Sequence, residues 1–353
     1  MKKASLAFLE RLMNTPSPSG FEQPVQRIVR DEAAKLADEV RTDLHGNVIA
    51  VKNPSGTPRV MLAGHCDQIG FIVSYINDEG FLYFRKIGGI DPTACVSQRV
   101  VIQGKQGPVA GVIGRKAIHM QEPDDRTKAP KLDALWIDIG AKDKEDAQKL
   151  VRLGDPGVFV QSFQLLQNGR AASMAFDNKM AVWIIAEAMR LASQSSHKAG
   201  VFGVSTVQEE IGSIGAHASA FSIEPDVAIV VDVGHATDHP GVEKTKAGDY
   251  ALDKGPILSR GANVNPRAFE MLVAAAEQEG VPYQTDAIGG RSATDADPIQ
   301  YSRAGVAVGL IHVPLRYMHT PCEIISLSDM EHTARLLAAF VRRLEPGVSF
   351  VPE

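Results

Sequence analysis

Residues 59–67 read RVMLAGHCD, a short apolar run that ends at a glycine and then at polar residues. Three later runs are also mostly apolar: GVFGVSTV at 200–207, VAIVVDV at 227–233 and GVAVGLIHV at 305–313. None of the four alternates apolar with polar residues, which is typical of strands that are buried on both faces by helices. The stretch at 59–67 and its three counterparts therefore predict an α/β domain.

Helical periodicity surrounds these strands. Leu6, Leu9 and Met13 fall on one helix face near the start of the chain. Long amphipathic patterns follow at 177–192, 265–280 and 327–345. Helices that alternate with buried strands are the arrangement expected for a sheet with helices packed against it.

Between residues 70 and 160 the texture changes to short β-like runs separated by Gly, Pro and Asp clusters. The only convincing helix there is AKDKEDAQKLV at 141–151. This segment predicts a small β-barrel or sandwich. We therefore expect one α/β domain, residues 1–69 and 161–353, interrupted by a β-rich insert at 70–160.

Length and composition limit the class of protein. The 353 residues suggest two domains, at about 150 residues each. A hydrophobic fraction of 44% with 22% charged residues suits a folded soluble chain, and no apolar run approaches the roughly 20 residues of a membrane span. The net charge of −5 argues against nucleic acid as a partner. Three cysteines and no signal-peptide pattern lead us to expect a reducing, cytoplasmic location.

Acidic and histidine side chains follow the ends of three predicted strands. The run at 59–67 ends in His65 and Asp67, the run at 200–207 is followed by Glu209 and Glu210, and Asp232 follows five apolar residues. Ligands of open α/β sheets bind outside the carboxyl ends of the strands, so these side chains should meet at one edge. Two loop residues are further candidates, Asp177 and His319.

A cluster of imidazoles and carboxylates without thiolates suits Zn, Co or Mn in a hydrolytic site. If one carboxylate bridges, five ligands give each of two metals three protein ligands and an open position. Two metals about 3.5–4 Å apart can acidify one water and polarise a carbonyl. Glu209, next to a ligand, is then the candidate general base, and Asp67 can fix the tautomer of the first histidine. The five candidate ligands are His65, Asp177, Glu210, Asp232 and His319.

Each motif also has a structural interpretation when it is taken alone. Asp177 could cap the helix that follows it, and Glu209 with Glu210 could be an exposed strand end. The segment IGGRSATDAD at 288–297 either lines a substrate pocket, through Arg291, Thr294 or Asp295, or forms a glycine-rich turn and a helix cap. Likewise, Arg316 either faces substrate or holds the loop of His319.

Five motifs in order resemble a known family: GHCDQIGFIV at 64–73, AFDNKM at 175–180, STVQEEIG at 205–212, VVDVGHATDHPG at 230–241 and PLRYMHTP at 314–321. The chain resembles the M42 metallopeptidases, which are glutamyl or deblocking aminopeptidases of the TET type. Some members carry the name endoglucanase. The resemblance covers nearly the whole chain, the β-rich insert included.

The resemblance implies a dinuclear metal-dependent aminopeptidase that removes N-terminal residues from peptides. It implies a phosphorylase/hydrolase-like three-layer domain with an inserted dimerisation domain, and dimers that assemble into a homododecamer. Carried over by position, His65 and Glu210 match ligands of one metal, and Asp232 and His319 match ligands of the other. Asp177 matches the bridging carboxylate, Glu209 the general base that activates a metal-bridging water, and Asp67 the residue that orients the first histidine.

Two other functions compete with this one. A metal-independent glycoside hydrolase of the endoglucanase type needs two carboxyl groups about 5–9.5 Å apart on opposite sides of the bond. Adjacent Glu209 and Glu210 suit that poorly, and the histidines would have no role. A non-enzymatic metal-binding scaffold would have no use for a base such as Glu209 that is not itself a ligand.

Overall fold

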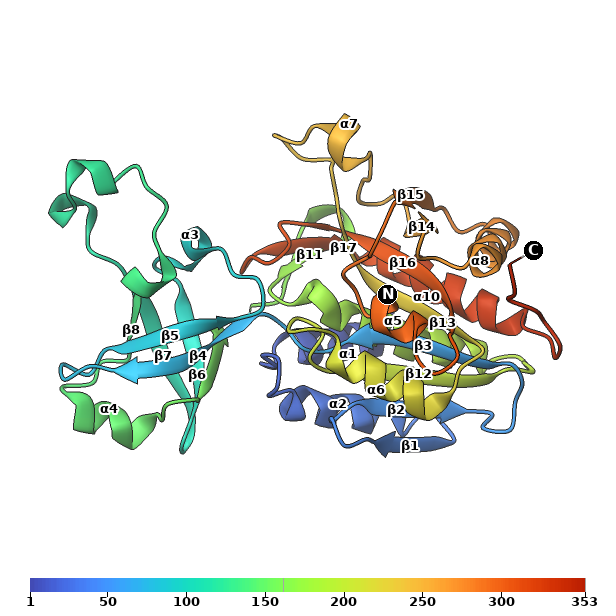
Figure 1. Ribbon diagram of the computed structural model, residues 1–353, viewed down its shortest axis with the longest axis horizontal. Coiled ribbons are helices and arrows are strands. Elements are labelled where there is room, and N and C mark those ends of the chain that lie inside the picture. Colours follow the sequence, from blue (N-terminus) through green and yellow to red (C-terminus); the bar gives the residue numbers. More distant parts are fainter. Residues whose placement is uncertain (161, 353) are drawn as a thin grey trace.

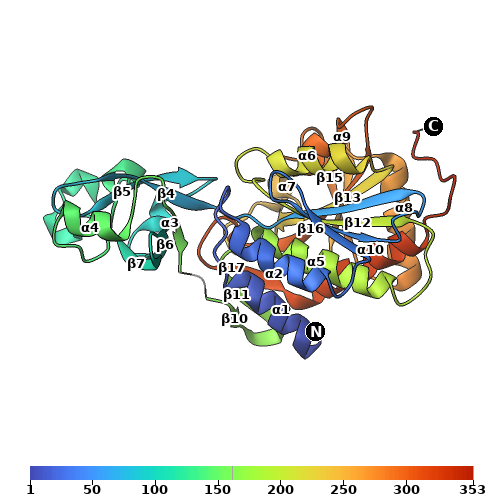
Figure 2. The ribbon, with the colours of Figure 1, turned by 90° about the horizontal axis from the view of Figure 1, so that it is seen from below.

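The computed structural model describes residues 1–160 and 162–352, and it contains one large mixed sheet with helices on both faces and a separate β-barrel (Figure 1). The barrel lies beside the main domain in both ribbon views (Figures 1 and 2). The architecture confirms the predicted α/β domain with a β-rich insert. No helix in the described part of the chain has the length and apolar content that a membrane span needs.

The centre of the main sheet is parallel and built from the four predicted strands. β12 pairs with β3, β3 with β13, and β13 with β16, all in parallel, so their carboxyl ends share one edge. Antiparallel strands extend the sheet on both sides, in the order β1-β2-β12-β3-β13-β16-β17-β11-β10, and β14 and β15 branch from β16. The bounds are β1 (Glu39–Thr42), β2 (Val48–Lys52), β3 (Arg59–His65), β10 (Gln164–Leu165), β11 (Arg170–Ser173), β12 (Gly200–Thr206), β13 (Val227–His235), β14 (Ile257–Gly261), β15 (Gln284–Ile288), β16 (Ala307–Arg316) and β17 (Glu323–Ser326).

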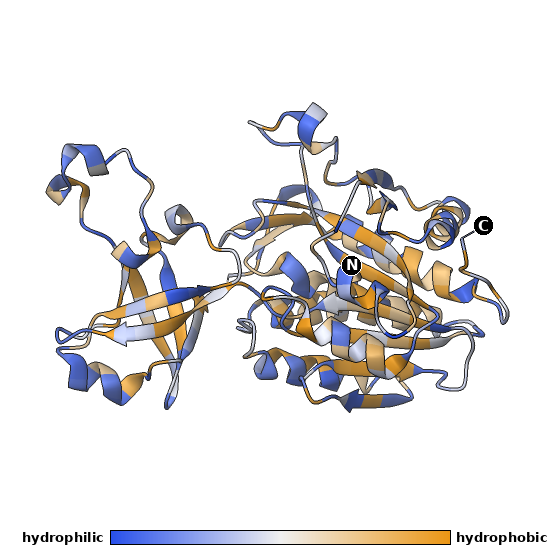
Figure 3. Cartoon of the chain, viewed as in Figure 1, coloured by the Kyte–Doolittle hydropathy of each residue, from blue (hydrophilic) through white to orange (hydrophobic). Residues whose placement is uncertain are grey.

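Alternate residues of the central strands belong to two different cores, one on each face of the sheet. Val60 and Leu62 of β3 pack in one core, and Met61 and Ala63 pack in the other. Both faces are therefore covered, which explains why these strands read as continuous apolar runs. Figure 3 shows the apolar residues along these strands. The first face carries α1 (Lys3–Met13), α2 (Gln23–Ala33), α5 (Phe176–Ala192), α8 (Pro266–Glu279) and α10 (Leu327–Arg342), and the second carries α6 (Ile214–Ile223) and α9 (Ala296–Gln300).

The insert is a closed antiparallel barrel with the strand order β4-β5-β8-β7-β6-β9. It has a core of its own that includes Phe71, Ile102 and Phe159. Residue 161, the predicted domain boundary, lies outside the described residues, and the boundaries at 69/70 and 160/161 stay a prediction. The barrel elements are β4 (Gly70–Ile76), β5 (Leu82–Ile87), β6 (Arg99–Gly104), β7 (Gly107–Gly114), β8 (Trp136–Asp138) and β9 (Pro156–Phe159), with short helices α3 (Pro92–Cys95) and α4 (Lys144–Leu150).

Close packing between β3 and α5 depends on Gly64, the residue before His65. A Cβ at Gly64 would lie 2.5 Å from Ala181 Cβ and 3.3 Å from the carbonyl oxygen of Val231. We expect Gly64→Ala to push α5 away and to lower the free energy of unfolding by about 1–3 kcal/mol, as overpacking does. Chemical denaturation measures this. Gly289→Ala is the control, because its Cβ would meet no atom within 4 Å. Equal stability of the two variants would contradict the packing argument.

Candidate metal centre

The strand ends bring the predicted acidic and histidine residues together at one edge of the sheet. His65 ends β3, Asp232 lies in the neighbouring strand β13, and Glu209 and Glu210 follow β12 on the other side of β3. His65 and Asp232 are both buried. The neighbouring strands therefore account for how residues so distant in the chain share one site.

Asp177 lies between the two histidines. Its Oδ1 is 3.3 Å from Nε2 of His65, and its Oδ2 is 3.3 Å from Nε2 of His319. It does not cap α5, because that helix has no side-chain cap and its N-cap position is Ala175. A carboxylate with one oxygen toward each histidine is arranged as a bridging ligand would be.

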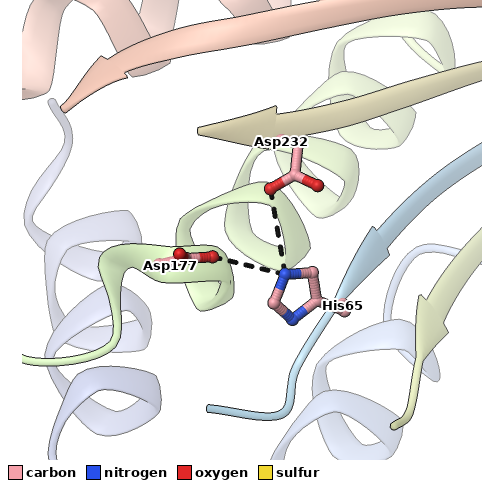
Figure 4. A group of neighbouring side chains, drawn as sticks. All are labelled: His65, Asp177 and Asp232. Carbon is pink, nitrogen blue, oxygen red and sulfur yellow. Dashed lines mark ion pairs between the residues drawn. The ribbon is translucent and has the colours of Figure 1, made fainter. Parts of the chain in front are cut away.

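Two groups of side chains share Asp177, and in each the candidate ligand atoms lie within 4.8 Å of one another. His65 and Asp232 complete the first group, where Nε2 of His65 is 3.8 Å from the Asp232 carboxylate (Figure 4). Glu210 and His319 complete the second, where Nε2 of His319 is 3.6 Å from the Glu210 carboxylate.

This grouping differs from the one that the resemblance implies, which puts His65 with Glu210 and Asp232 with His319. Asp232 lies on β13, directly beside β3, whereas Glu210 and His319 belong to loops that approach Asp177 from its other oxygen.

Asp67 holds the first histidine and the loop of the two glutamates at the same time. Its Oδ1 accepts a hydrogen bond from the backbone N–H of Glu209 at 3.0 Å, and its Oδ2 accepts from the N–H of Glu210 at 3.1 Å and from the hydroxyl of Ser19 at 2.6 Å. Nδ1 of His65 lies 3.1 Å from the Asp67 carbonyl oxygen and 3.4 Å from Oδ1. With only acceptors around Nδ1, that nitrogen carries the proton, and Nε2 presents its lone pair to the site.

Two further parts of the chain position the second group, and neither stood out in the sequence. Glu323 is buried and accepts hydrogen bonds from the N–H groups of Asp177 at 3.2 Å and His319 at 3.1 Å. Gly89, on the barrel side of the chain, packs so closely that a Cβ there would lie 2.8 Å from Nδ1 of His319. An acidic residue that opens the apolar run EIIS at 323–326 was the available signal for Glu323.

The electrostatics of the site favour bound cations. Burial raises the pKa of Glu209 to about 9 and of Asp232 to about 7, because each would otherwise be a desolvated anion among other carboxylates. Burial also raises the pKa of Glu210, whose Oε1 has no hydrogen-bond partner among the described residues. An orphaned carboxylate oxygen beside histidine nitrogens fits a divalent metal ion.

The metal centre opens into a cavity of about 540 Å³. Of the four residues predicted to bind substrate, Thr294 lines this cavity. The other three are not among the residues that line it. The side chain of Arg291 is 83% exposed and pairs with Asp297, Asp295 is buried and accepts from the hydroxyl of Thr206, and Arg316 pairs with Asp238 at 2.8 Å.

The family model of the M42 glutamyl aminopeptidases matches residues 46–336. The chain belongs to the M42 aminopeptidase family. Among relatives of this M42 aminopeptidase, a lysyl aminopeptidase of Pyrococcus furiosus is 32% identical, over 98% of both chains. The confirmed family agrees with the resemblance of the five motifs.

Solved structures support the same assignment. A TET aminopeptidase from the archaeon Thaumarchaeota archaeon SCGC AB-539-E09 has a TM-score of 0.93 and 36% identity, over 97% of both chains. The TET1 peptidase of Pyrococcus horikoshii, which can assemble into a tetrahedron or a large octahedral shell, has a TM-score of 0.84 and 28% identity, over 96% of this chain and all of that one. A structure described as an endoglucanase of Thermotoga maritima has a TM-score of 0.77 and 29% identity, over 95% and 96% of the two chains.

Asp67→Asn tests the role of the carboxylate that joins His65 to the glutamate loop. An asparagine keeps one acceptor oxygen but turns an NH₂ group toward donors, so the imidazole and the loop lose their shared anchor. We expect metal affinity to fall about 10- to 100-fold, the usual cost of losing such a partner. Competition with a chromogenic chelator measures it. The surface variant Asp38→Asn should bind metal normally, and equal affinity of Asp67→Asn would contradict the role.

Thermal stability without metal should depend on pH. Asp232 and Glu209, with pKa values of about 7 and about 9 in the folded chain, hold protons that the unfolded chain has already released at neutral pH. Stability therefore falls as pH rises through these values. We expect the Tm of the chelated protein to fall between pH 6 and 9 in scanning calorimetry. Excess Zn, Co or Mn should remove most of the fall, and a flat Tm in chelator would contradict this.

Proposed function

We propose that this M42 aminopeptidase is a dinuclear metal-dependent enzyme that removes N-terminal residues from peptides. His65 and Asp232 would hold one ion, Glu210 and His319 the other, and Asp177 both. The proposal is carried by the position of the Asp177 carboxylate. Its Oδ1 lies 3.3 Å from Nε2 of His65, and its Oδ2 lies 3.3 Å from Nε2 of His319.

The donor set of imidazole and carboxylate accepts Zn, Co or Mn. When bound, such ions acidify water and polarise the carbonyl of the scissile peptide bond. The protein's part is to fix the donors in place. Asp67 does so for His65, and Glu323 does so for Asp177 and His319.

Glu209 is the proposed general base. Its carboxylate lies 3.8 Å from Nε2 of His65 and lines the cavity, yet it belongs to neither group of candidate ligands. The hydroxyl of Ser213 lies 3.4 Å from its Oε1, and Asp67 holds its backbone. From this position Glu209 can take a proton from the attacking water and return it to the amine that leaves.

The other two functions fit the geometry less well. A glycoside hydrolase needs two free carboxyl groups across a sugar, whereas Glu210 and Asp177 here face histidine nitrogens. A metal-binding scaffold leaves unexplained a half-buried Glu209 that lines the cavity and belongs to neither group of candidate ligands. Hydrolysis of peptides uses every one of these residues.

The barrel is the proposed surface for self-association, with dimers that build a homododecamer in a cytoplasmic setting. One relative, PhTET1-12s, is described as a dodecamer, with a TM-score of 0.86 and 28% identity over 98% of this chain and all of that one. In this chain Ile118 and Met120 on the barrel's long loop are exposed, and such apolar side chains suit a contact between copies. A closed particle would admit only unfolded peptides.

Glu209→Gln separates catalysis from metal binding. The amide cannot accept the proton of water, so we expect kcat on aminoacyl p-nitroanilides to fall about 10²- to 10⁴-fold while each chain keeps its two metal ions. Elemental analysis measures the metal. Asp177→Asn should lose metal as well as activity, and the exposed Glu270→Gln should lose neither. Loss of metal in Glu209→Gln would make it a ligand, and activity that resists chelators would overturn the proposed function.

A further inference from the structure

The cavity extends well beyond the metal centre, into a pocket formed by the branch of the main sheet. Tyr250, Ile257, Asp286 and His312 line this outer part. Ile257 lies on β14, Asp286 on β15 and His312 on β16, so a separate set of strands builds it (Figure 1). We call these four residues the outer pocket.

Hydrogen bonds hold the polar side chains of the outer pocket in place. Oδ1 of Asp286 accepts a hydrogen bond from the hydroxyl of Tyr250 at 2.5 Å. Ser259, the register partner of Asp286 on β14, has its hydroxyl 3.3 Å from Nδ1 of His312. Asp286 and Tyr250 are partly buried, and both line the cavity. The carboxylate is therefore held in one position and still faces the cavity.

The charge of the outer pocket is negative. Of the residues that line the cavity, all within the described ranges, none is lysine or arginine, and Asp286 is the carboxylate that lies outside the metal centre. Burial lowers the pKa of His312 to about 4, so this imidazole is neutral at pH 7 and does not offset Asp286. An anionic group entering the pocket would be repelled, and a cationic group would gain a partner.

The distance from the metal centre suits a long side chain. Asp232 on β13 and Asp286 on β15 are separated by three strand steps through β16 and β14, on the order of 14 Å at about 4.8 Å a step. Gly234, which lines the cavity next to His312, has no side chain to close the path. The α-amino group of a substrate stays beside the scissile bond, so Asp286, three strands away, is placed to meet the end of the substrate's first side chain instead.

We infer that Asp286 binds the ammonium or guanidinium group of a lysine or arginine at the substrate's first position, and so selects basic N-terminal residues over acidic ones. This inference rests on the proposed aminopeptidase function and adds its substrate class. Tyr250 orients the carboxylate through its hydrogen bond, and the uncharged imidazole of His312 forms one side of the pocket.

The test compares lysine with norleucine, which has nearly the same length and no charge. The full-length, metal-loaded protein is assayed with the p-nitroanilides of lysine, norleucine, leucine and glutamate. We expect kcat/KM for lysine to exceed that for norleucine at least tenfold, with glutamate the poorest. In Asp286→Asn the ratio of lysine to norleucine should fall at least tenfold, as expected when a hydrogen-bonded charge partner is lost.

Two controls separate binding from structure. Tyr250→Phe removes the hydrogen bond that orients the carboxylate but leaves its charge, so the ratio should fall less than it does in Asp286→Asn. Asp249→Asn, at an exposed residue that does not line the cavity, makes the same change in charge and should keep the ratio. A ratio that is unchanged in Asp286→Asn, or that falls equally in either control, overturns the inference.

The same assay distinguishes failure of the inference from failure of the proposed function. Chelator-sensitive cleavage of leucine and norleucine substrates without a preference for lysine would overturn only the role of Asp286. If no aminoacyl substrate is cleaved, or if chelators have no effect, the proposed function fails and the inference fails with it.

Discussion

The buried carboxylate of Asp67 is the constraint on which the site depends. It ties His65, at the end of β3, to the backbone of Glu209 and Glu210 and to the hydroxyl of Ser19. Burying a carboxylate is costly unless it is fully hydrogen-bonded, and here donors from three separate parts of the chain meet that need. Because the same group fixes the imidazole tautomer and the glutamate loop, neither can move without the other.

The metal centre concentrates negative charge in one cavity. Four carboxylates line the cavity within the metal centre, at Asp177, Glu209, Glu210 and Asp232, and two histidines cannot balance them all. Folding alone does not favour such a concentration of like charges, as the raised pKa values of Glu209 and Asp232 show. Two divalent cations would supply the missing positive charge. The arrangement is therefore understandable as a site selected for metal and catalysis rather than for stability.

Much of the fold and of the candidate site could be predicted from the sequence. Four apolar strands indicate a sheet that is covered on both faces, and the polar residues at the ends of three of them indicate the edge that carries the site. The distances between the candidate ligands could not be predicted, since they depend on side chains at the ends of strands that pair in the order β12-β3-β13-β16, which is not the order along the chain. Glu323 and Ser19 act through backbone and hydroxyl contacts that leave no spacing pattern. Asp286 was missed because β15, which reads QTDAI, is partly exposed and carries no apolar run.

The barrel has a part in the site as well as in the fold. The chain leaves the main sheet at His65, forms the first barrel strands, and passes Gly88 and Gly89 against the second group of candidate ligands. A Cβ at Gly88 would lie 3.0 Å from Glu210 Oε2, and one at Gly89 would lie 2.8 Å from His319 Nδ1. Only glycine allows so close an approach. The segment that follows β5 therefore packs directly against Glu210 and His319 and helps to fix their positions.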